Sequence, residues 1–395
     1  MSGHRIISRR DLLTYAAAGA GLAAYGDIPG LAEAAAAKQG TVTLADIGVG
    51  DPGTWAPFTN PTGWGVRLVS IGNAPATILS VLITGGGTRV YDIANIVGGM
   101  QQPLVQNNLI EPIDTSRLPN WSRDTFIRRY LARGTPGFNF IGYKGTVYGV
   151  PTVLQGDSFA FLPEKTGHLD SYGALFDPRW RGYVALEDNF TTAGQKTALY
   201  LKASGRAQIA NPANMTPGEI KTTVDFLIKM KKRGQFRTLW TSFNDAVTLL
   251  TSKEVYVLDC WEPMVIAANK AGAKTVYARP KEGFLLWAMA AYITRNPNRS
   301  AHQTQGVYAL LNFMLGGWYG AKITLLRGYM TNPAAARYAA SHRHEFTPAE
   351  AQQVAAIQRR VQAKFEAGGT WQNRWPTHLT VYEEEWARFK AAPSG

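Results

Sequence analysis

Residues Gly48 to Gly53 match the G-x-G-x-x-G pattern of loops that bind the pyrophosphate of a dinucleotide. In such sites the glycines open a helix whose N-terminus holds the phosphates, and an acidic residue follows about 20 residues later. Here Pro52, Pro57 and Pro61 interrupt the segment where that helix would run. The next predicted strand ends at Ile71 without an acid. We therefore expect a strand-end loop that lines a cleft, and no nucleotide site.

Other patterns that could support catalysis or metal binding are incomplete. His342-Arg343-His344-Glu345 has two histidines and one acid, but no further His or Cys cluster completes a ligand set. Gly156-Asp157-Ser158-Phe159 departs from the G-x-S-x-G nucleophile elbow at its last position. Cys260, the only cysteine, lies in an apolar stretch and is expected to be a buried structural thiol. We expect no catalysis, no metal and no cofactor.

Four aromatic residues at predicted strand ends or in loops are the positive signal for binding: Trp261, Trp287, Tyr329 and Trp371. Tryptophan and tyrosine offer apolar faces and one polar edge, so such residues can wall a cleft. A row of them could enclose an alkyl chain or hold a cation over a ring. The alternative is that each is an ordinary core or surface residue.

Strand-like and helix-like stretches alternate along the chain, which predicts an α/β fold with mostly parallel sheets flanked by helices. The predicted strands are Thr41–Val49, Val66–Ile71, Tyr91–Val97, two runs within Val147–Phe161, Tyr183–Glu187, Val255–Cys260, Lys274–Ala278 and Leu285–Ile293. The predicted helices are Ala74–Ile83, Met100–Asn107, Thr191–Ala203, Pro217–Arg233 and Asn244–Thr251, with a mainly helical tail from His302.

Two extended connections, near residues 147–155 and 276–287, suggest that the chain forms two hinged lobes. We predict that residues 41–150 with 284–335 form the first lobe, and 151–283 with 336–392 the second. A hinge of this kind places a cleft between the lobes, where closure can trap a small ligand.

The N-terminus has the form of a twin-arginine export signal. Ser8-Arg9-Arg10-Asp11-Leu12-Leu13 precedes a short apolar run, Tyr15–Tyr25, and the small-residue stretch Ala34–Ala37. The run is shorter than the about 20 residues of a membrane span. We expect the Tat export machinery to recognise residues 1–37 and signal peptidase to remove them, leaving a soluble protein in the periplasm.

The composition is globular, with 45% hydrophobic and 17% charged residues, and the net charge is +13. The basic residues are scattered, and the densest run, Lys229–Arg233, ends a predicted helix, where cations are favoured. We expect a solvated basic surface, no nucleic-acid partner, and a monomer.

Several short motifs occur in an order and spacing that fit one family. They are Tyr91-Asp92-Ile93, Asn108–Asp114, Tyr148–Pro151, Phe176–Gly182, Pro280–Gly283 with Trp287, Leu311–Leu315, Trp371-Gln372-Asn373 and Tyr382-Glu383-Glu384. Over nearly the whole mature chain, the sequence resembles the periplasmic solute-binding proteins of ABC importers, in the spermidine/putrescine-binding branch. The resemblance implies a two-lobed, type II-like periplasmic binding protein fold, no catalysis, and delivery of a ligand to an inner-membrane ABC permease.

The resemblance also implies ligand contacts. Trp261, Trp287, Tyr329 and Gln372 fall on ligand-contacting positions of the polyamine binders. The acid of their W-x-D motif is replaced by Met289, and two further acids align with Asn189 and Thr192, beside Asp188. Because each buried ammonium needs an anionic partner, a site with few acids suits a monocation, a zwitterion or a neutral molecule.

We predict a small amine-bearing, polyamine-like ligand, bound by Trp261, Trp287, Tyr329, Gln372, Asp188, Glu262, Asp157, Asn189 and Asp51. Strand neighbours alternate sides, so at most one of Asp259 and Glu262 is expected to face the cleft. An anionic or zwitterionic solute, held by strand-end N–H groups and a basic residue such as Arg279, is the alternative. An exported cofactor enzyme and a binder that serves a membrane sensor are further alternatives.

Overall fold

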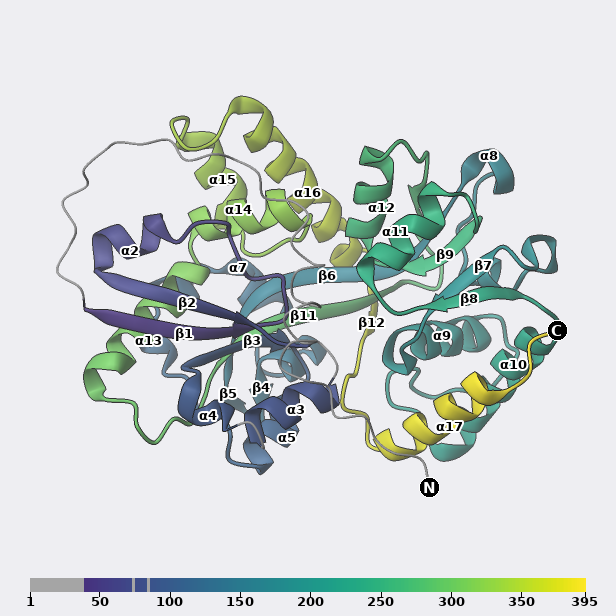
Figure 1. Cartoon of the computed structure of the whole chain (residues 1–395), viewed down its shortest axis with the longest axis horizontal. Helices are drawn as coiled ribbons and strands as arrows, with labels where there is room; N and C mark the ends of the chain where they lie inside the picture. Colours follow the sequence, from purple (N-terminus) through teal and green to yellow (C-terminus); the bar gives the residue numbers. More distant parts are fainter. Residues whose placement is uncertain (1–38, 73–74, 84–85) are drawn as a thin grey trace, which may run out of the picture. The chain divides into compact units, whose positions relative to one another are not determined.

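The computed structural model describes residues 39–72, 75–83 and 86–395. The predicted export signal, residues 1–37, lies outside this range. The main sheet has ten strands. Eight of them lie in the order β2 (Trp64–Ser70), β1 (Gly40–Asp46), β3 (Ile93–Val97), β11 (Phe284–Ile293), β6 (Gly149–Phe161), β9 (Val257–Cys260), β7 (Val184–Glu187) and β8 (Phe236–Trp240) (Figure 1). Two short strands, β10 (Val276–Tyr277) and β12 (Gly369–Trp371), pair with β6 and β11, and β4 (Gly142–Tyr143) pairs with β5 (Thr146–Val147).

Two long antiparallel strands, β6 and β11, run through the middle of the sheet (Figure 1). Their register extends from Gly149 opposite Tyr292 to Asp157 opposite Leu285, with an irregularity after Met289. Every residue of both strands is buried, as expected of strands covered on both faces. The predicted connections at 147–155 and 276–287 overlap these strands.

The outer strands form two parallel groups. β1 pairs with β2 and β3 at one end, and β7 pairs with β8 and β9 at the other, all in parallel. A first core surrounds the β1–β3 group and includes Val42, Ile96 and Leu310. A second core at the β7–β9 end includes Phe159 and Leu227. This mixed architecture confirms the predicted α/β class.

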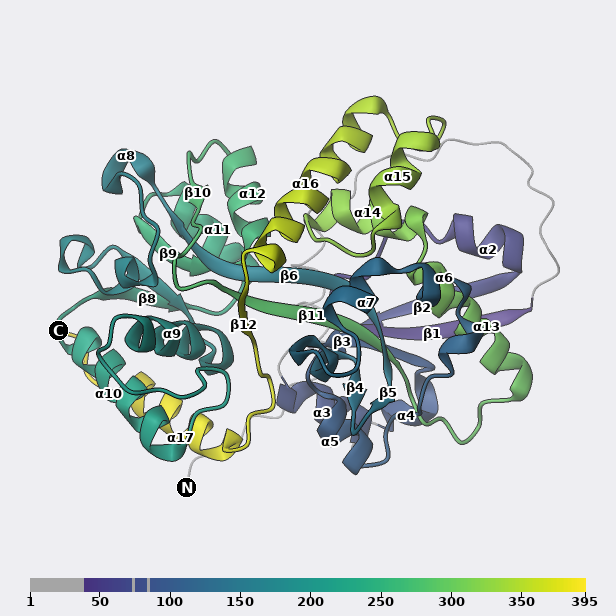
Figure 2. The same ribbon diagram turned by 180° about the vertical axis from the view of Figure 1, so that it is seen from behind.

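Helices cover both ends of the sheet. Those of the first half of the chain are α2 (Ala56–Thr62), α3 (Pro75–Ile83), α4 (Gly87–Val90), α5 (Gln101–Gln106), α6 (Pro119–Arg123), α7 (Thr125–Tyr130), α8 (Pro163–Thr166) and α9 (Gln195–Ala203). Those of the second half are α10 (Pro217–Lys232), α11 (Phe243–Thr251), α12 (Glu262–Lys270), α13 (Ala301–Met314), α14 (Gly317–Arg327), α15 (Ala334–Ser341), α16 (Pro348–Glu366) and α17 (Leu379–Ala391) (Figure 2). Capping boxes, such as Thr216 with Glu219, define the first turns of α10, α11 and α16.

Short helical turns complete the connections. Four are 3-10 turns, Thr115–Arg117, Pro136–Phe140, Tyr172–Phe176 and Pro178–Trp180, and one is a π turn, Phe190–Gly194. The predicted helix Thr191–Ala203 therefore consists of this π turn followed by α9. The sequence did not predict β8 or β12: β12 has only three residues, and β8, at the sheet edge, exposes two of its five residues.

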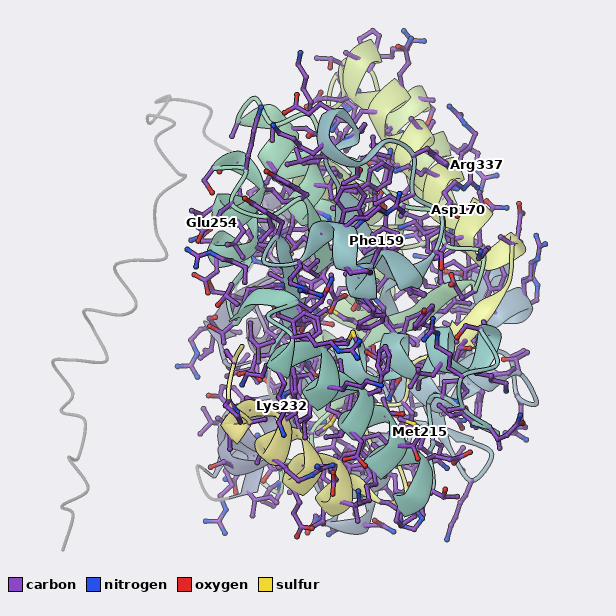
Figure 3. All side chains as sticks on the ribbon, turned by 90° about the vertical axis from the view of Figure 1, so that its right-hand side faces the viewer. Phe159, Asp170, Met215, Lys232, Glu254 and Arg337 are labelled. Carbon is purple, nitrogen blue, oxygen red and sulfur yellow. The ribbon has the colours of Figure 1, made fainter. Side chains whose placement is uncertain are left out.

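The C-terminal helices divide between the two cores. Val354 and Val361 of α16 belong to the first core, whereas Tyr382 and Phe389 of α17 belong to the second. We therefore propose a lobe boundary at β12 in place of residue 336. In the view onto the second core, Phe159 lies in the interior and Glu254 is exposed (Figure 3). No described helix has the length and hydropathy needed to cross a bilayer.

Candidate functional site

A cavity of about 450 Å³ opens where several parallel strands end. Val49 follows β1, Val97 ends β3, Glu187 ends β7, Trp240 ends β8, and Trp261 follows β9; all five line the cavity. The carboxyl ends of both parallel groups therefore meet at one place. Ligands of open α/β sheets bind at this edge of the strands.

Two pairs of aromatic rings form much of the cavity wall. The rings of Trp261 and Trp240 meet edge to face with centroids 5.6 Å apart, and those of Trp287 and Tyr329 do the same at 5.6 Å. Trp371 instead packs between Phe140 and Phe365 and does not line this cavity. Three of the four aromatic residues singled out in the sequence therefore lie together.

Asp157 is the least satisfied polar side chain of the cavity. It is 1% exposed, and neither carboxylate oxygen has a hydrogen-bond partner among the described residues. Burial raises the pKa of Asp157, while the ammonium of Lys196 and the nearby indole of Trp287 favour its charged form. The indole nitrogen of Trp287 likewise has no hydrogen-bond partner within the described chain, so the two groups are near each other but not bonded. A cation placed here would meet an unused buried carboxylate.

Glu187 is a second buried acid of the cavity. One carboxylate oxygen accepts a hydrogen bond from the indole nitrogen of Trp261 at 3.1 Å, and the other from the amide of Asn189 at 3.4 Å. Burial, followed by the negative charge of Asp259, raises the pKa of Glu187 to about 7. Glu187 therefore orients two cavity residues and is close to half-ionised at neutral pH.

Arg374 brings a positive charge to the same cavity. It follows β12, its residue surface is 8% exposed, and it lines the cavity. Burial lowers the pKa of Arg374, whereas the negative charges of Glu187 and Asp157 raise it. The cavity thus contains buried acids and a buried base.

A fully buried ion pair connects the strands that carry Asp157 and Glu187. The ammonium of Lys196 contacts the carboxylate of Asp259 and also donates to the carbonyl of Ser158 at 3.1 Å. The other carboxylate oxygen of Asp259 accepts the backbone N–H of Glu187 at 3.2 Å. This pair therefore links β6, β7 and β9 through Ser158, Glu187 and Asp259.

Asp188 and Asn189 stand at the edge of the cavity. One oxygen of Asp188 accepts from the indole of Trp386 at 2.7 Å, and the other lies 3.2 Å from the ammonium of Lys390. The side-chain oxygen of Asn189 accepts the backbone N–H of Thr191 and so caps the π turn. Both predicted residues line the cavity, each with partners of its own.

Three other predicted residues do not line this cavity. Glu262 is buried in a separate pocket, which Arg279 also lines, and binds Arg360 and Lys364. Gln372 donates to the carbonyl of Thr191 at 2.7 Å and faces a neighbouring pocket. Asp51 accepts the backbone N–H of Gly53 at 2.9 Å. Asp259, by pairing with Lys196, also stays out of the cavity lining.

The carboxylate of Asp46, the last residue of β1, holds the glycine-rich loop that follows the strand. The carboxylate of Asp46 accepts the backbone N–H groups of Gly48, Val49 and Gly50 at 2.6, 2.8 and 3.0 Å. The amide of Asn95 donates to the same carboxylate at 2.6 Å. The loop amides that could bind a phosphate are therefore occupied, and the loop lines the cavity through Ile47 and Val49, which agrees with the sequence-based prediction.

Two further sequence predictions concern possible reactive groups. Cys260 is fully buried, as predicted, and burial raises its pKa. The ring of His342 stacks on Tyr338 at 3.6 Å. Within residues 39–395, apart from the gaps, no group of three or more potential ligands is arranged to hold a metal.

Sequence reasoning missed Glu187, Arg374 and Trp240. Glu187 could have been found, because it ends a predicted strand beside Asp188. Arg374 follows the Trp371–Asn373 motif, but nothing in that motif indicates that its side chain reaches the cavity. Trp240 was missed because it ends β8, which was itself not predicted.

Comparisons with known proteins identify the family. The model for bacterial extracellular solute-binding proteins matches residues 54–349. Spermidine/putrescine-binding periplasmic protein 1 of Haemophilus influenzae is 26% identical over 338 residues, covering 85% of this chain and 84% of that protein.

Solved structures establish the fold. The spermidine/putrescine ABC transporter substrate-binding protein PotD of Streptococcus pneumoniae matches with a TM-score of 0.65 at 16% identity, covering 89% of this chain and 98% of its own. AgtB of A. tumefaciens, in complex with agropinic acid, matches with a TM-score of 0.62 at 19% identity and the same coverage. These matches confirm the two-lobed periplasmic binding protein fold. Because the family model matches more than half of the sequence, the chain belongs to the bacterial extracellular solute-binding proteins.

Proposed function

We propose that the protein captures a small amine-bearing solute in the cavity and delivers it to an ABC permease in the inner membrane. The observation that carries this proposal is Asp157, whose buried carboxylate has no hydrogen-bond partner among the described residues. A buried charge without a partner is costly, and an ammonium group would supply both the opposite charge and up to three hydrogen-bond donors.

The aromatic wall suits the rest of such a molecule. Trp261, Trp287 and Tyr329 present ring faces and edges around the same space as Asp157. Rings of this kind pack against alkyl chains and attract cations to their faces. The Haemophilus influenzae relative, named for spermidine and putrescine, supports an amine as the ligand.

We propose that eight residues form the ligand site. They are Asp157, Trp261, Trp287, Tyr329, Asp188, Asn189, Glu187 and Arg374. Three residues that the sequence predicted are not proposed to contact the ligand, because they lie outside the cavity lining: Glu262, Gln372 and Asp51. Gln372 instead supports the site indirectly through its bond to Thr191.

Hinge closure would enclose the ligand. Val49, Val97 and Tyr329 belong to or pack against the first core, whereas Glu187 and Trp261 lie at the other end of the sheet. The two groups are joined through β6, β11 and the segment around β12. A rotation about these segments would bring the two halves of the cavity wall together around a solute.

We further propose export through the twin-arginine route and action as a monomer in the periplasm. The export signal in the sequence and the periplasmic relative support this location. A reporter fused to residues 1–37 should be exported, and changing Arg9 and Arg10 to Lys should stop export.

A thermal-shift screen of amines, amino acids, opines and organic acids tests the proposed ligand class. A ligand at 100 times its dissociation constant stabilises the fold by about 2.7 kcal/mol. We expect hits that carry an ammonium group, and solution scattering should show a more compact protein with the hit bound. Hits confined to di-anions would contradict the proposal.

Asp157→Asn and the matched variant Glu262→Gln then locate the site by calorimetry. Asp157→Asn should weaken amine binding by about 2 kcal/mol or more with little change in the stability of the free protein, because no hydrogen bond to the carboxylate is lost. Glu262→Gln should lower stability, since it leaves Lys364 buried without its acid, but should leave the affinity unchanged. Unchanged amine binding in Asp157→Asn would overturn the assigned site.

A further inference from the structure

Arg374 is a buried cation without a hydrogen-bonded or ion-paired partner in the described part of the chain. Its residue surface is 8% exposed, and it lines the same cavity as Asp157. A guanidinium group stays charged at all physiological pH values, so it cannot relieve burial by losing a proton. We expect such a group to pair with an acidic group in the ligand-bound protein.

Its neighbours do not supply that partner. Glu187 and Asp157 act on the charge of Arg374 through space, but no described acid lies within ion-pair distance of it. Glu187 already accepts hydrogen bonds from Trp261 and Asn189. The fork of Arg374 therefore remains available to a ligand.

The other buried or cavity-lining cations of this region are each paired. Lys196 contacts Asp259, Lys364 contacts Glu262, and Lys390 contacts Asp188. Arg374 differs from these three in the described chain, since it combines burial, a place in the cavity lining and no acidic contact. This difference points to a role in binding.

The geometry of guanidinium selects the kind of group it would bind. Its planar fork of N–H donors matches the two oxygens of a carboxylate, which gives paired, charge-assisted hydrogen bonds. The cavity therefore offers an unpartnered carboxylate, an unpartnered guanidinium, and apolar lining residues that include Val97 and Met289.

We propose that the solute is an amino-carboxylate zwitterion, with its ammonium on Asp157 and its carboxylate on Arg374. This inference rests on the proposed function, since it uses the same cavity and the same ammonium site. A diamine or polyamine would bring a second ammonium into the field of Arg374, where like charges repel. Arg374 therefore selects against the polyamines and for molecules that carry both charges.

A panel of matched probes tests this selection in the unmodified protein. The probes are ω-amino acids, α,ω-diamines, monoamines and monocarboxylates of equal carbon number, from three to eight carbons, together with α-amino acids and opines. Affinities are measured by calorimetry. We expect the best amino-carboxylate to bind at least about tenfold more tightly than the diamine and the carboxylate of the same length.

Variants of Arg374 identify the group responsible. Arg374→Gln should weaken the best amino-carboxylate by about 30-fold or more and change the matched monoamine by less than about threefold. Arg374→Lys keeps the charge without the fork and should fall between these values. Circular dichroism and a thermal melt confirm that both variants are folded, and Asp157→Asn should weaken amino-carboxylate and monoamine alike.

The outcomes separate the two proposals. Amines that bind through Asp157 with no preference for a carboxylate, or with a preference that survives Arg374→Gln, would overturn this inference and leave the proposed function standing. Tight binding of monocarboxylates that is insensitive to Asp157→Asn would overturn the proposed function. If no probe that carries an ammonium binds, both are wrong.

Discussion

The ammonium of Lys196 contacts the carboxylate of Asp259, and neither side chain has any exposed surface. Burial alone lowers the pKa of Lys196, but the negative charges of Asp259, Asp157 and Glu187 raise it overall. The lysine therefore stays charged at neutral pH. Because the same pair holds the backbone of Glu187, it connects the stability of the fold to the position of the cavity acids.

Removing the lysine should be strongly destabilising. We expect Lys196→Met to lower the free energy of unfolding by about 3–5 kcal/mol, because it leaves Asp259 buried without its partner. The double variant Lys196→Met/Asp259→Leu should recover much of that loss. Urea unfolding measures both.

An exposed ion pair provides the control for this prediction. Lys221 and Asp225 are 2.6 Å apart on the surface of α10, and Lys221→Met should change stability by less than about 1 kcal/mol. If Lys196→Met and Lys221→Met lowered the free energy of unfolding equally, the buried pair would contribute no more to stability than the exposed pair.

Glu187 should make stability depend on pH. Its pKa is 4.5 in the reference state and about 7 in the folded protein, so the folded protein binds this proton more tightly. The stability from this group is fully present below about pH 4.5 and is lost as the pH rises through about 7. The charged groups that act on Glu187 are Asp259, Lys196, Arg374 and Asp157.

Glu187→Gln removes this titration. Compared with the unmodified protein, the variant should be more stable above pH 7.5 by roughly 3 kcal/mol, and nearly equal at pH 4. Chemical unfolding from pH 4 to 9 measures the difference, in which the titrations of other groups largely cancel. A stability difference that stays constant over this range would contradict the raised pKa.

Trp261→Phe should weaken ligand binding with little effect on the fold. Trp261 is half-buried, and the change removes the N–H group that holds Glu187 while keeping an aromatic ring beside Trp240. We expect a loss of about 0.5–1.5 kcal/mol in the binding of the best amine from the screen. Calorimetry measures this loss, and Trp121→Phe, at a half-buried position outside the cavity lining, is the control. An unchanged affinity in Trp261→Phe would remove this residue from the site.

Much of the fold follows from local patterns in the sequence. Two extended runs within Val147–Phe161 and the apolar run Leu285–Ile293 predicted the segments of β6 and β11, and several predicted strand ends line the cavity. The strands β8 and β12 were not predicted. β12 has only three residues, and in β8 the adjacent exposed residues Arg237 and Thr238 interrupt the apolar pattern of a buried strand.

The sequence could not show which acidic residues line the cavity. Glu262 directly follows Trp261, but it begins α12 and therefore turns toward Arg360 and Lys364. Asp157 was one of several candidate acids, and only its surroundings show that both of its oxygens lack a partner. Which acid meets which base is decided by contacts between residues more than 60 positions apart, such as Lys196 and Asp259.

The two long central strands couple the unfolding of the two halves of the molecule. Val150 and Val153 of β6 belong to the first core, whereas Phe159 and Phe161 of the same strand belong to the second. Neither half can lose its interior packing without disturbing a strand that the other half needs. Heating should therefore melt the whole molecule in one cooperative step, and a fragment that ends within β6 should be unstable and prone to aggregate.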